Sequence, residues 1–175
     1  MTTNKQQKIL FSTDEIKEKV KELGQQISKD YEGKELVVVS LLRGSFIFAA
    51  DLVREIEVPT QIEFMTTASY GHDEESSGQV NIVTDIKDDI EGRDVLVVDD
   101  IMDTGLTMKK ILEHLKEKKP NSIKSCVMLD KPERRKTEIT SDYVGFTIPD
   151  LFIVGYGLNY GDYYRNIPYI FSFVD

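Results

Sequence analysis

Cysteine is nearly absent from this sequence, since Cys126 is the single one among 175 residues. One cysteine cannot form a disulfide framework within the chain, which excludes the class of disulfide-stabilised secreted domains and favours a cytoplasmic protein. Long hydrophobic runs are also missing, because no apolar stretch approaches the roughly 20 residues of a membrane-spanning helix. The polar start, residues 1–8, does not look like a signal peptide. We therefore expect a cytoplasmic protein without a membrane partner.

Positive charge is in short supply. The chain has 22 Lys and Arg side chains against 31 Asp and Glu side chains, which gives a net charge of −9. This balance argues against nucleic acids or anionic membranes as the main binding partners. Internal repeats, low-complexity segments and linkers are absent from the sequence as well. We therefore expect residues 1–175 to form one domain, long enough to bury a sizeable core.

Segments typical of strands and helices alternate through the first two-thirds of the sequence. Ser12 and Glu15 have the spacing of a capping box at the start of a predicted helix. Further helices are predicted over 46–56 and 106–118, and strands over 36–42, 62–64, 80–86, 95–98, 122–129, 143–146, 151–155 and 169–173. This alternation predicts an α/β fold with a mainly parallel twisted sheet flanked by helices. Ligands of such sheets bind at the carboxyl ends of the strands.

The most informative segment is 95–107, which reads VLVVDDIMDTGLT. Its apolar run ends in the adjacent carboxylates Asp99 and Asp100, as a buried parallel strand does at the edge of a sheet. The polar loop that follows consists of Asp103, Thr104, Gly105, Leu106 and Thr107. Backbone N–H groups at a helix start, with hydroxyls and a glycine beside them, suit a phosphate. Acids beside a phosphate require a sugar hydroxyl or a divalent cation between them. The segment therefore predicts a site for a phosphorylated sugar with a metal.

This segment resembles the phosphoribosyl-pyrophosphate signature of type I phosphoribosyltransferases. The resemblance implies that Asp99 and Asp100 bind the ribose hydroxyls and Mg²⁺, and that residues 103–107 bind the 5′-phosphate. It also implies the fold of that family, in which a small hood built from terminal segments covers the sheet. The structural alternative is that Asp99 and Asp100 only end a strand and that Asp103 caps the next helix.

A second loop, residues 41–45, follows a predicted strand and faces the same edge of the sheet. Arg43 supplies a permanent positive charge, and Gly44 lets the backbone approach an anion. The resemblance implies that Leu42, Arg43 and Gly44 bind pyrophosphate together with Arg165. It also implies a cis peptide bond between Leu42 and Arg43. Taken alone, the loop is equally compatible with an ordinary turn from strand to helix.

A polar stretch that begins with Ser69 and Tyr70 and runs to Gly78 lies between two predicted strands. A long polar loop is either irregular surface or a lid. This one resembles the flexible lid of hypoxanthine-type phosphoribosyltransferases, where water must be kept from an oxocarbenium-like centre. We interpret both histidines, His72 in this stretch and His114 in a predicted helix, as surface residues.

The last third of the chain resembles the base pocket of hypoxanthine-guanine phosphoribosyltransferases. The matching pieces are 129–132 (LDKP), 143–150 (YVGFTIPD) and 152–157 (FIVGYG). The resemblance implies that Lys131 donates a hydrogen bond to the 6-oxo group of the purine, that Phe152 stacks on the base, and that the backbone of Ile153 meets its edge. Adenine has a donor at position 6, which would leave Lys131 unpaired. In isolation, Lys131 is more simply a surface residue and Phe152 a core residue.

The resemblance implies that Asp103 is the catalytic residue, since an acid there would face N7 of a purine as a general base or an electrostatic stabiliser. Asn159 departs from the pattern of the family, which usually has an aspartate in contact with a second Mg²⁺ at this position. An amide oxygen accepts hydrogen bonds but brings no charge. We therefore expect Asn159 to bind a second Mg²⁺ weakly.

The resemblance implies an enzyme of purine salvage that uses Mg²⁺. It would transfer phosphoribosyl from 5-phosphoribosyl 1-pyrophosphate to N9 of hypoxanthine, and of guanine, and would form a homodimer or a homotetramer. One alternative is a xanthine-guanine phosphoribosyltransferase, against which the longer lid argues. The other is a non-catalytic regulator that senses phosphoribosyl pyrophosphate and binds nucleic acid. The acidic composition argues against this second alternative.

Overall fold

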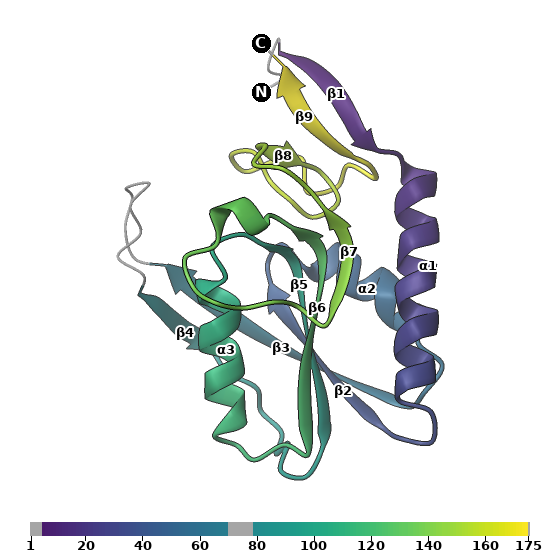
Figure 1. Cartoon of the computed structure of the whole chain (residues 1–175), viewed down its shortest axis with the longest axis vertical. Coiled ribbons are helices and arrows are strands. Elements are labelled where there is room, and N and C mark those ends of the chain that lie inside the picture. The colour runs from purple at the N-terminus through teal and green to yellow at the C-terminus, as the bar shows by residue number, and fades with distance from the viewer. Residues whose placement is uncertain (1–4, 70–78, 175) are drawn as a thin grey trace.

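The fold consists of a six-stranded main sheet with helices on both faces and a three-stranded hood (Figure 1). The computed structural model describes residues 5–69 and 79–174. The elements in chain order are β1 (Gln6–Phe11), α1 (Thr13–Asp30), β2 (Leu36–Leu42), α2 (Phe46–Arg54), β3 (Thr60–Ser69), β4 (Val80–Thr84), β5 (Asp94–Met102), α3 (Leu106–Lys116), β6 (Ser122–Asp130), the 3-10 helix η1 (Pro132–Arg134), β7 (Tyr143–Thr147), β8 (Ile153–Val154) and β9 (Ile170–Val174).

The main sheet has the strand order β4-β3-β2-β5-β6-β7. Strands β3, β2, β5, β6 and β7 are parallel, whereas β4 pairs antiparallel with β3. The predicted α/β fold with a mainly parallel sheet is therefore confirmed. From β2 the chain moves outward to β3 and later returns to β5 on the other side of β2. Such a reversal between neighbouring strands is where open α/β sheets leave a crevice for ligands.

The central strands are buried on both faces because their side chains alternate between two apolar cores. On one face, Leu36 and Val38 of β2 pack in a core with buried residues of α1 and α2. On the other face, Val37 and Val39 pack in a core with residues of α3 such as Ile111. Residues 95–98 of β5 divide between the same two cores. Burial on both faces fixes the carboxyl ends of β2 and β5 relative to each other.

Helix α1 begins at the predicted capping box. The Ser12 hydroxyl accepts a hydrogen bond from the Glu15 backbone N–H at 3.1 Å, and the Glu15 carboxylate accepts one from the Ser12 N–H at 3.2 Å. Each bond satisfies a backbone donor that has no partner within the helix.

The hood is a sheet of order β1-β9-β8, and it brings the first and the last strand, β1 and β9, side by side (Figure 1). Strand β9 pairs antiparallel with both β1 and β8. A hood built from terminal segments was implied by the resemblance and is confirmed. Strand β1 was not predicted, because its residues are largely exposed and lack a buried alternating face. Its strand conformation depends on pairing with β9, more than 150 residues away in sequence, as in the pair Gln6↔Val174.

Some local predictions were wrong. Strand β5 does not end before the acids, since its pairing with β6 continues to Met102↔Asp130 and places Asp99 and Asp100 within the strand. Helices α2 and α3 end two residues earlier than predicted, and the strand expected over 151–155 is only Ile153–Val154. His114, which we interpreted as a surface residue, has a side chain that is only 27% exposed, and its Nε2 lies 2.8 Å from Asp85 Oδ2. No helix in the described part of the chain is long and apolar enough to span a bilayer.

Candidate active site

The carboxyl ends of β2 and β5 separate and leave a cleft. Pairing between these strands stops at Ser40↔Val98, whereas β2 continues along β3 to Leu42 and β5 continues along β6 to Met102. The cleft has a volume of about 390 Å³. It is lined by most of the residues predicted for the sugar-donor side, namely Leu42, Gly44, Asp99, Asp100, Asp103, Thr104, Gly105, Thr107, Asn159 and Arg165. The fold therefore gathers residues that are more than 120 positions apart in the sequence.

Asp99 and Asp100 lie next to each other in this cleft and are partly buried. Asp99 Oδ1 accepts a hydrogen bond from the Asp100 N–H, and Asp100 Oδ1 accepts one from the Ile101 N–H, both at 2.9 Å. Burial and the neighbouring charge of Asp100 raise the pKa of Asp99 well above its ordinary value. Burial also raises the pKa of Asp100, although the charge of Arg165 opposes the rise. Because the ionised forms of both acids are disfavoured here, a bound cation or hydroxyl donors would stabilise the two carboxylates.

The loop between β5 and α3 directs the start of a helix into the cleft. Gly105 caps α3 with a positive φ of 84°, a conformation that glycine adopts without a steric cost. A Cβ added at Gly105 would also press on Ile139 Cγ2 at 2.5 Å. The Leu106 N–H donates to the Thr104 hydroxyl at 3.3 Å, and the other first-turn N–H groups have no acceptor within the helix. These donors and the threonine hydroxyls suit a phosphate.

Three separate segments meet at the predicted pyrophosphate side. A Cβ added at Gly44 would overlap the Asp100 carboxylate, and one added at Gly157 would overlap the Gly44 carbonyl oxygen. Arg165 Nη1 donates to the Gly157 carbonyl at 2.7 Å, which fixes the guanidinium beside the cleft. The Leu42–Arg43 peptide bond is cis, as the resemblance implied. The Arg43 residue itself is exposed and does not line the cleft.

The predicted purine side adjoins this cleft without lining it. Lys131 is 7% exposed at the end of β6, and its Nζ lies 4.0 Å from Asp150 Oδ1. Phe152 is 61% exposed, and its ring meets that of Tyr160 edge-on with the centroids 5.9 Å apart. Ile153 is buried in β8. Lysine is usually exposed and phenylalanine usually buried, so both residues are the reverse of the usual preference. Such an arrangement suits side chains that bind a ligand.

Arg134 and Arg135 were not predicted as part of the site. Arg135 donates to the Asp103 carbonyl at 2.8 Å and to the Met102 carbonyl at 3.3 Å, and it forms an ion pair with Asp130. Arg134 Nε lies 2.9 Å from Asp103 Oδ1. The signal available in the sequence was the basic run 134–136 just after a strand that ends at the cleft.

Two further predictions concern the metal and the lid. Within residues 5–69 and 79–174, no three His, Cys, Asp or Glu side chains gather into a metal site. The acid pair and the amide of Asn159 do line one cleft. Such hard oxygen ligands fit Mg²⁺, which takes one or two carboxylates and completes its shell with water and substrate phosphates. Of the predicted lid, Ser69 is the last residue of β3, and Tyr70 to Gly78 lie outside the described residues.

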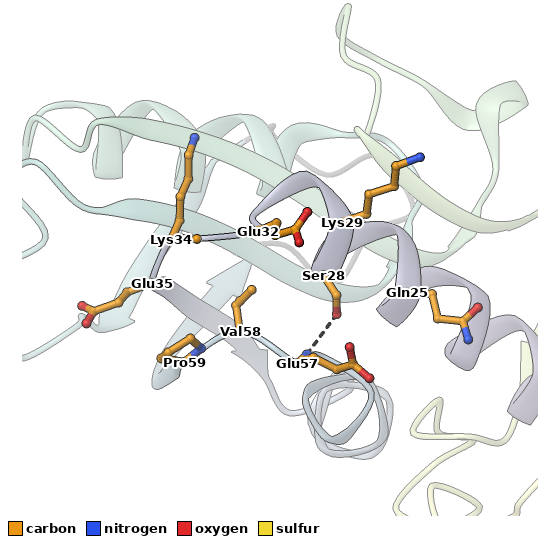
Figure 2. Close-up of a pocket in the computed structure, with 10 residues that line it drawn as sticks. Gln25, Ser28, Lys29, Glu32, Lys34, Glu35, Glu57, Val58 and Pro59 are labelled. Atoms are coloured by element: carbon orange, nitrogen blue, oxygen red, sulfur yellow. Dashed lines mark hydrogen bonds between the residues drawn. The ribbon is translucent and has the colours of Figure 1, made fainter.

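A larger hollow of about 820 Å³ lies at the opposite edge of the sheet, where residues 34–35 and 58–59 precede β2 and β3. Figure 2 shows that its charged side chains, among them Lys29, Lys34 and Glu35, point in different directions. The one hydrogen bond drawn there joins the Glu57 N–H to the Ser28 hydroxyl at 2.9 Å. Because its polar groups do not converge, this hollow lacks the character of a small-molecule site.

The parallel sheet and the cleft at its carboxyl edge are those expected of a phosphoribosyltransferase, and comparison with protein families agrees. The family model for the phosphoribosyl transferase domain matches residues 6–161. The chain belongs to this family.

Similar proteins give a finer comparison. The chain is 51% identical to the hypoxanthine-guanine phosphoribosyltransferase of Aquifex aeolicus, over 98% of this chain and 97% of that one. It is 46% identical to the hypoxanthine phosphoribosyltransferase of Salmonella typhimurium, over 93% of this chain and 92% of that one. The crystal structure of a hypoxanthine-guanine phosphoribosyltransferase from Bacillus anthracis superposes with a TM-score of 0.91 at 49% identity, covering 95% of this chain and 98% of that one.

Proposed function

We propose that this protein is a hypoxanthine phosphoribosyltransferase that also accepts guanine. It transfers the phosphoribosyl group of 5-phosphoribosyl 1-pyrophosphate to N9 of the purine and releases pyrophosphate, so that IMP or GMP is the product of this salvage reaction. The observation that carries the proposal is the single cleft in which the acid pair, the loop 103–107 and Arg165 converge. The relatives that bear this name support the purine specificity.

The sugar donor binds along the carboxyl ends of β5 and β2. Its 5′-phosphate accepts hydrogen bonds from the N–H groups and hydroxyls of residues 103–107 at the start of α3. Asp99 and Asp100 bind the ribose hydroxyls. The pyrophosphate group lies against Leu42, Arg43 and Gly44, with the guanidinium of Arg165 opposite. The positive charges on that side stabilise the negative charge that develops on the leaving group.

Mg²⁺ is the cofactor that the oxygen ligands of the cleft fit. Asp99 and Asp100 would bind it directly or through its waters, and the uncharged Asn159 would bind a second ion weakly. When bound, Mg²⁺ neutralises charge on the pyrophosphate.

The purine binds between Lys131 and Asp103. Lys131 donates to the 6-oxo group, Phe152 stacks on the ring, and the backbone of Ile153 meets the edge of the base. N9 forms a bond to C1′ of the ribose as the bond from C1′ to the pyrophosphate oxygen breaks, and Asp103 accepts the proton that the purine loses at N7. The 6-amino group of adenine is a hydrogen-bond donor and would face the ammonium of Lys131, which has only donors, so adenine is rejected.

We propose that Ser69, Tyr70 and the residues up to Gly78 form a lid that excludes water from the reacting sugar. We also propose a homodimer or a homotetramer that acts in the cytoplasm, where the free and buried Cys126 needs no partner.

A steady-state assay with phosphoribosyl pyrophosphate, Mg²⁺ and each purine in turn tests the function. We expect turnover of hypoxanthine and guanine but not of adenine. The variant Asp103→Asn should lower kcat about 100-fold or more, the usual contribution of a positioned base. Absence of turnover with every purine, despite tight binding of the donor, would overturn the proposal and favour a ligand-sensing regulator.

A further inference from the structure

One carboxylate oxygen of Asp103 lies against a charged side chain of the protein. Oδ1 of Asp103 is closed to solvent, and no aligned hydrogen bond reaches it from any described residue. Its charged neighbour is Arg134, whose Nε lies 2.9 Å away. A carboxylate has two oxygens, and a guanidinium beside one of them fixes which oxygen is free to face a ligand.

The backbone around Arg134 is anchored to the loop that carries Asp103. Arg134 ends the 3-10 helix η1, in which its N–H donates to the Lys131 carbonyl at 3.1 Å. The Lys131 N–H donates in turn to the Met102 carbonyl at 2.9 Å, and the Lys136 N–H donates to the Thr104 carbonyl at 2.9 Å. The segment therefore contacts the loop on both sides of Asp103, which holds the backbone of Arg134 beside the loop that carries Asp103.

Arg134 also connects Asp103 with the other end of the proposed purine site. Its Nη1 lies 3.7 Å from Asp150 Oδ1, and the same oxygen lies 4.0 Å from Lys131 Nζ. The four side chains Asp103, Arg134, Asp150 and Lys131 thus form a series of neighbouring charges of alternating sign, with the proposed N7 contact at one end and the proposed 6-oxo contact at the other. Arg134 and Asp150 are about half exposed, whereas Lys131 is almost entirely buried.

We propose that Arg134 is a positioning residue for Asp103. It contacts Oδ1 and leaves Oδ2 directed at N7 of the purine, and through Asp150 it sets the distance between Asp103 and Lys131. Arg135, its neighbour, has a different task, because its contacts to the loop are to the backbone carbonyls of Met102 and Asp103. The inference rests on the role proposed above for Asp103.

A double-mutant cycle between Arg134 and Asp103 tests this coupling. A partly exposed charge pair contributes modestly, so Arg134→Gln should lower kcat/KM for hypoxanthine by about three- to fivefold, with the KM for phosphoribosyl pyrophosphate unchanged. Arg134→Lys should restore part of the loss, since an ammonium keeps the charge without the planar fork. In the Asp103→Asn background, Arg134→Gln should change the rate by less than about twofold, because the partner through which it acts has lost its charge.

Arg135→Gln is the matched control. Because Arg135 supports the backbone of the phosphate loop, its loss should raise the KM for phosphoribosyl pyrophosphate and should do so equally in both backgrounds. If the effects of Arg134→Gln and Asp103→Asn simply multiply, Arg134 acts through the fold and the inference is wrong. A fully active Asp103→Asn variant would instead overturn the role of Asp103 itself, so the two failures are distinguishable.

Discussion

Gly157, which follows strand β8 of the hood, packs closely on Gly44 of the pyrophosphate loop, and we expect this contact to position the loop. Gly157 has a φ of +98°, and a Cβ placed on it would overlap the carbonyl oxygen of Gly44. Gly44 in turn packs so closely on Asp100 that it has no room for a Cβ of its own. The variant Gly157→Ala should therefore displace the loop that binds pyrophosphate, although residue 157 itself need not touch the substrate.

The size of the effect follows from two separate costs. A left-handed backbone costs a residue with a Cβ about 1–2 kcal/mol, which corresponds to a loss of about 2–8 °C in Tm for a chain of this size. The second cost is steric, because a backbone carbonyl must move by about 1 Å before ordinary contact is restored, and a displacement of that size in a binding element lowers the rate on the order of 100-fold. Gly92 has a similar φ of +71° with nothing within 4 Å of an added Cβ, so Gly92→Ala carries only the first cost.

The measurements are thermal unfolding and kcat/KM for phosphoribosyl pyrophosphate at saturating hypoxanthine. Gly157→Ala should lose at least as much Tm as Gly92→Ala, because it carries the steric cost as well, and only Gly157→Ala should lose about 100-fold in kcat/KM. Gly92 lies just before β5, at the edge of the sheet away from the cleft, and its variant should stay within about threefold of the parent activity. If both variants retain comparable activity, the packing of residue 157 does not position the loop, and the reasoning fails.

Two further predictions concern charge in the cleft. Burial raises the pKa of Asp100 in the folded protein, so its ionisation costs more in the folded than in the unfolded state and lowers stability above the unfolded value of about 4. Asp100→Asn should therefore raise Tm near pH 7 while abolishing transfer, and the gain should shrink as pH falls towards about 4; a gain independent of pH would contradict this electrostatic origin. Asn159 lines the same cleft and donates from Nδ2 to the Gly161 carbonyl at 2.8 Å. Asn159→Asp should add a charge and lower the Mg²⁺ concentration that gives half-maximal rate, and an unchanged Mg²⁺ dependence would refute the role of Asn159.

The sequence alone determined the features that are encoded over short stretches. Buried strands such as β2 show as continuous apolar runs, and the Ser12–Glu15 capping box involves residues only three positions apart. The segment 95–107 contains the strand, the acids and the helix start of the donor site in consecutive residues. Because these patterns are local, the α/β fold and most of the cleft could be predicted from them.

Other features depend on residues that are distant in the sequence and were decided only by the tertiary structure. Strand β1 has a largely exposed sequence and exists because β9 pairs with it. The acids lie inside β5 because β6 extends far enough to pair beside them. His114 meets Asp85 across 29 positions, and Arg134 reaches Asp103 across a similar span. In each case the neighbouring residues in sequence do not determine the conformation or the partner of the residue. The tertiary structure determines it, because these contacts form only where the whole fold brings two distant groups together.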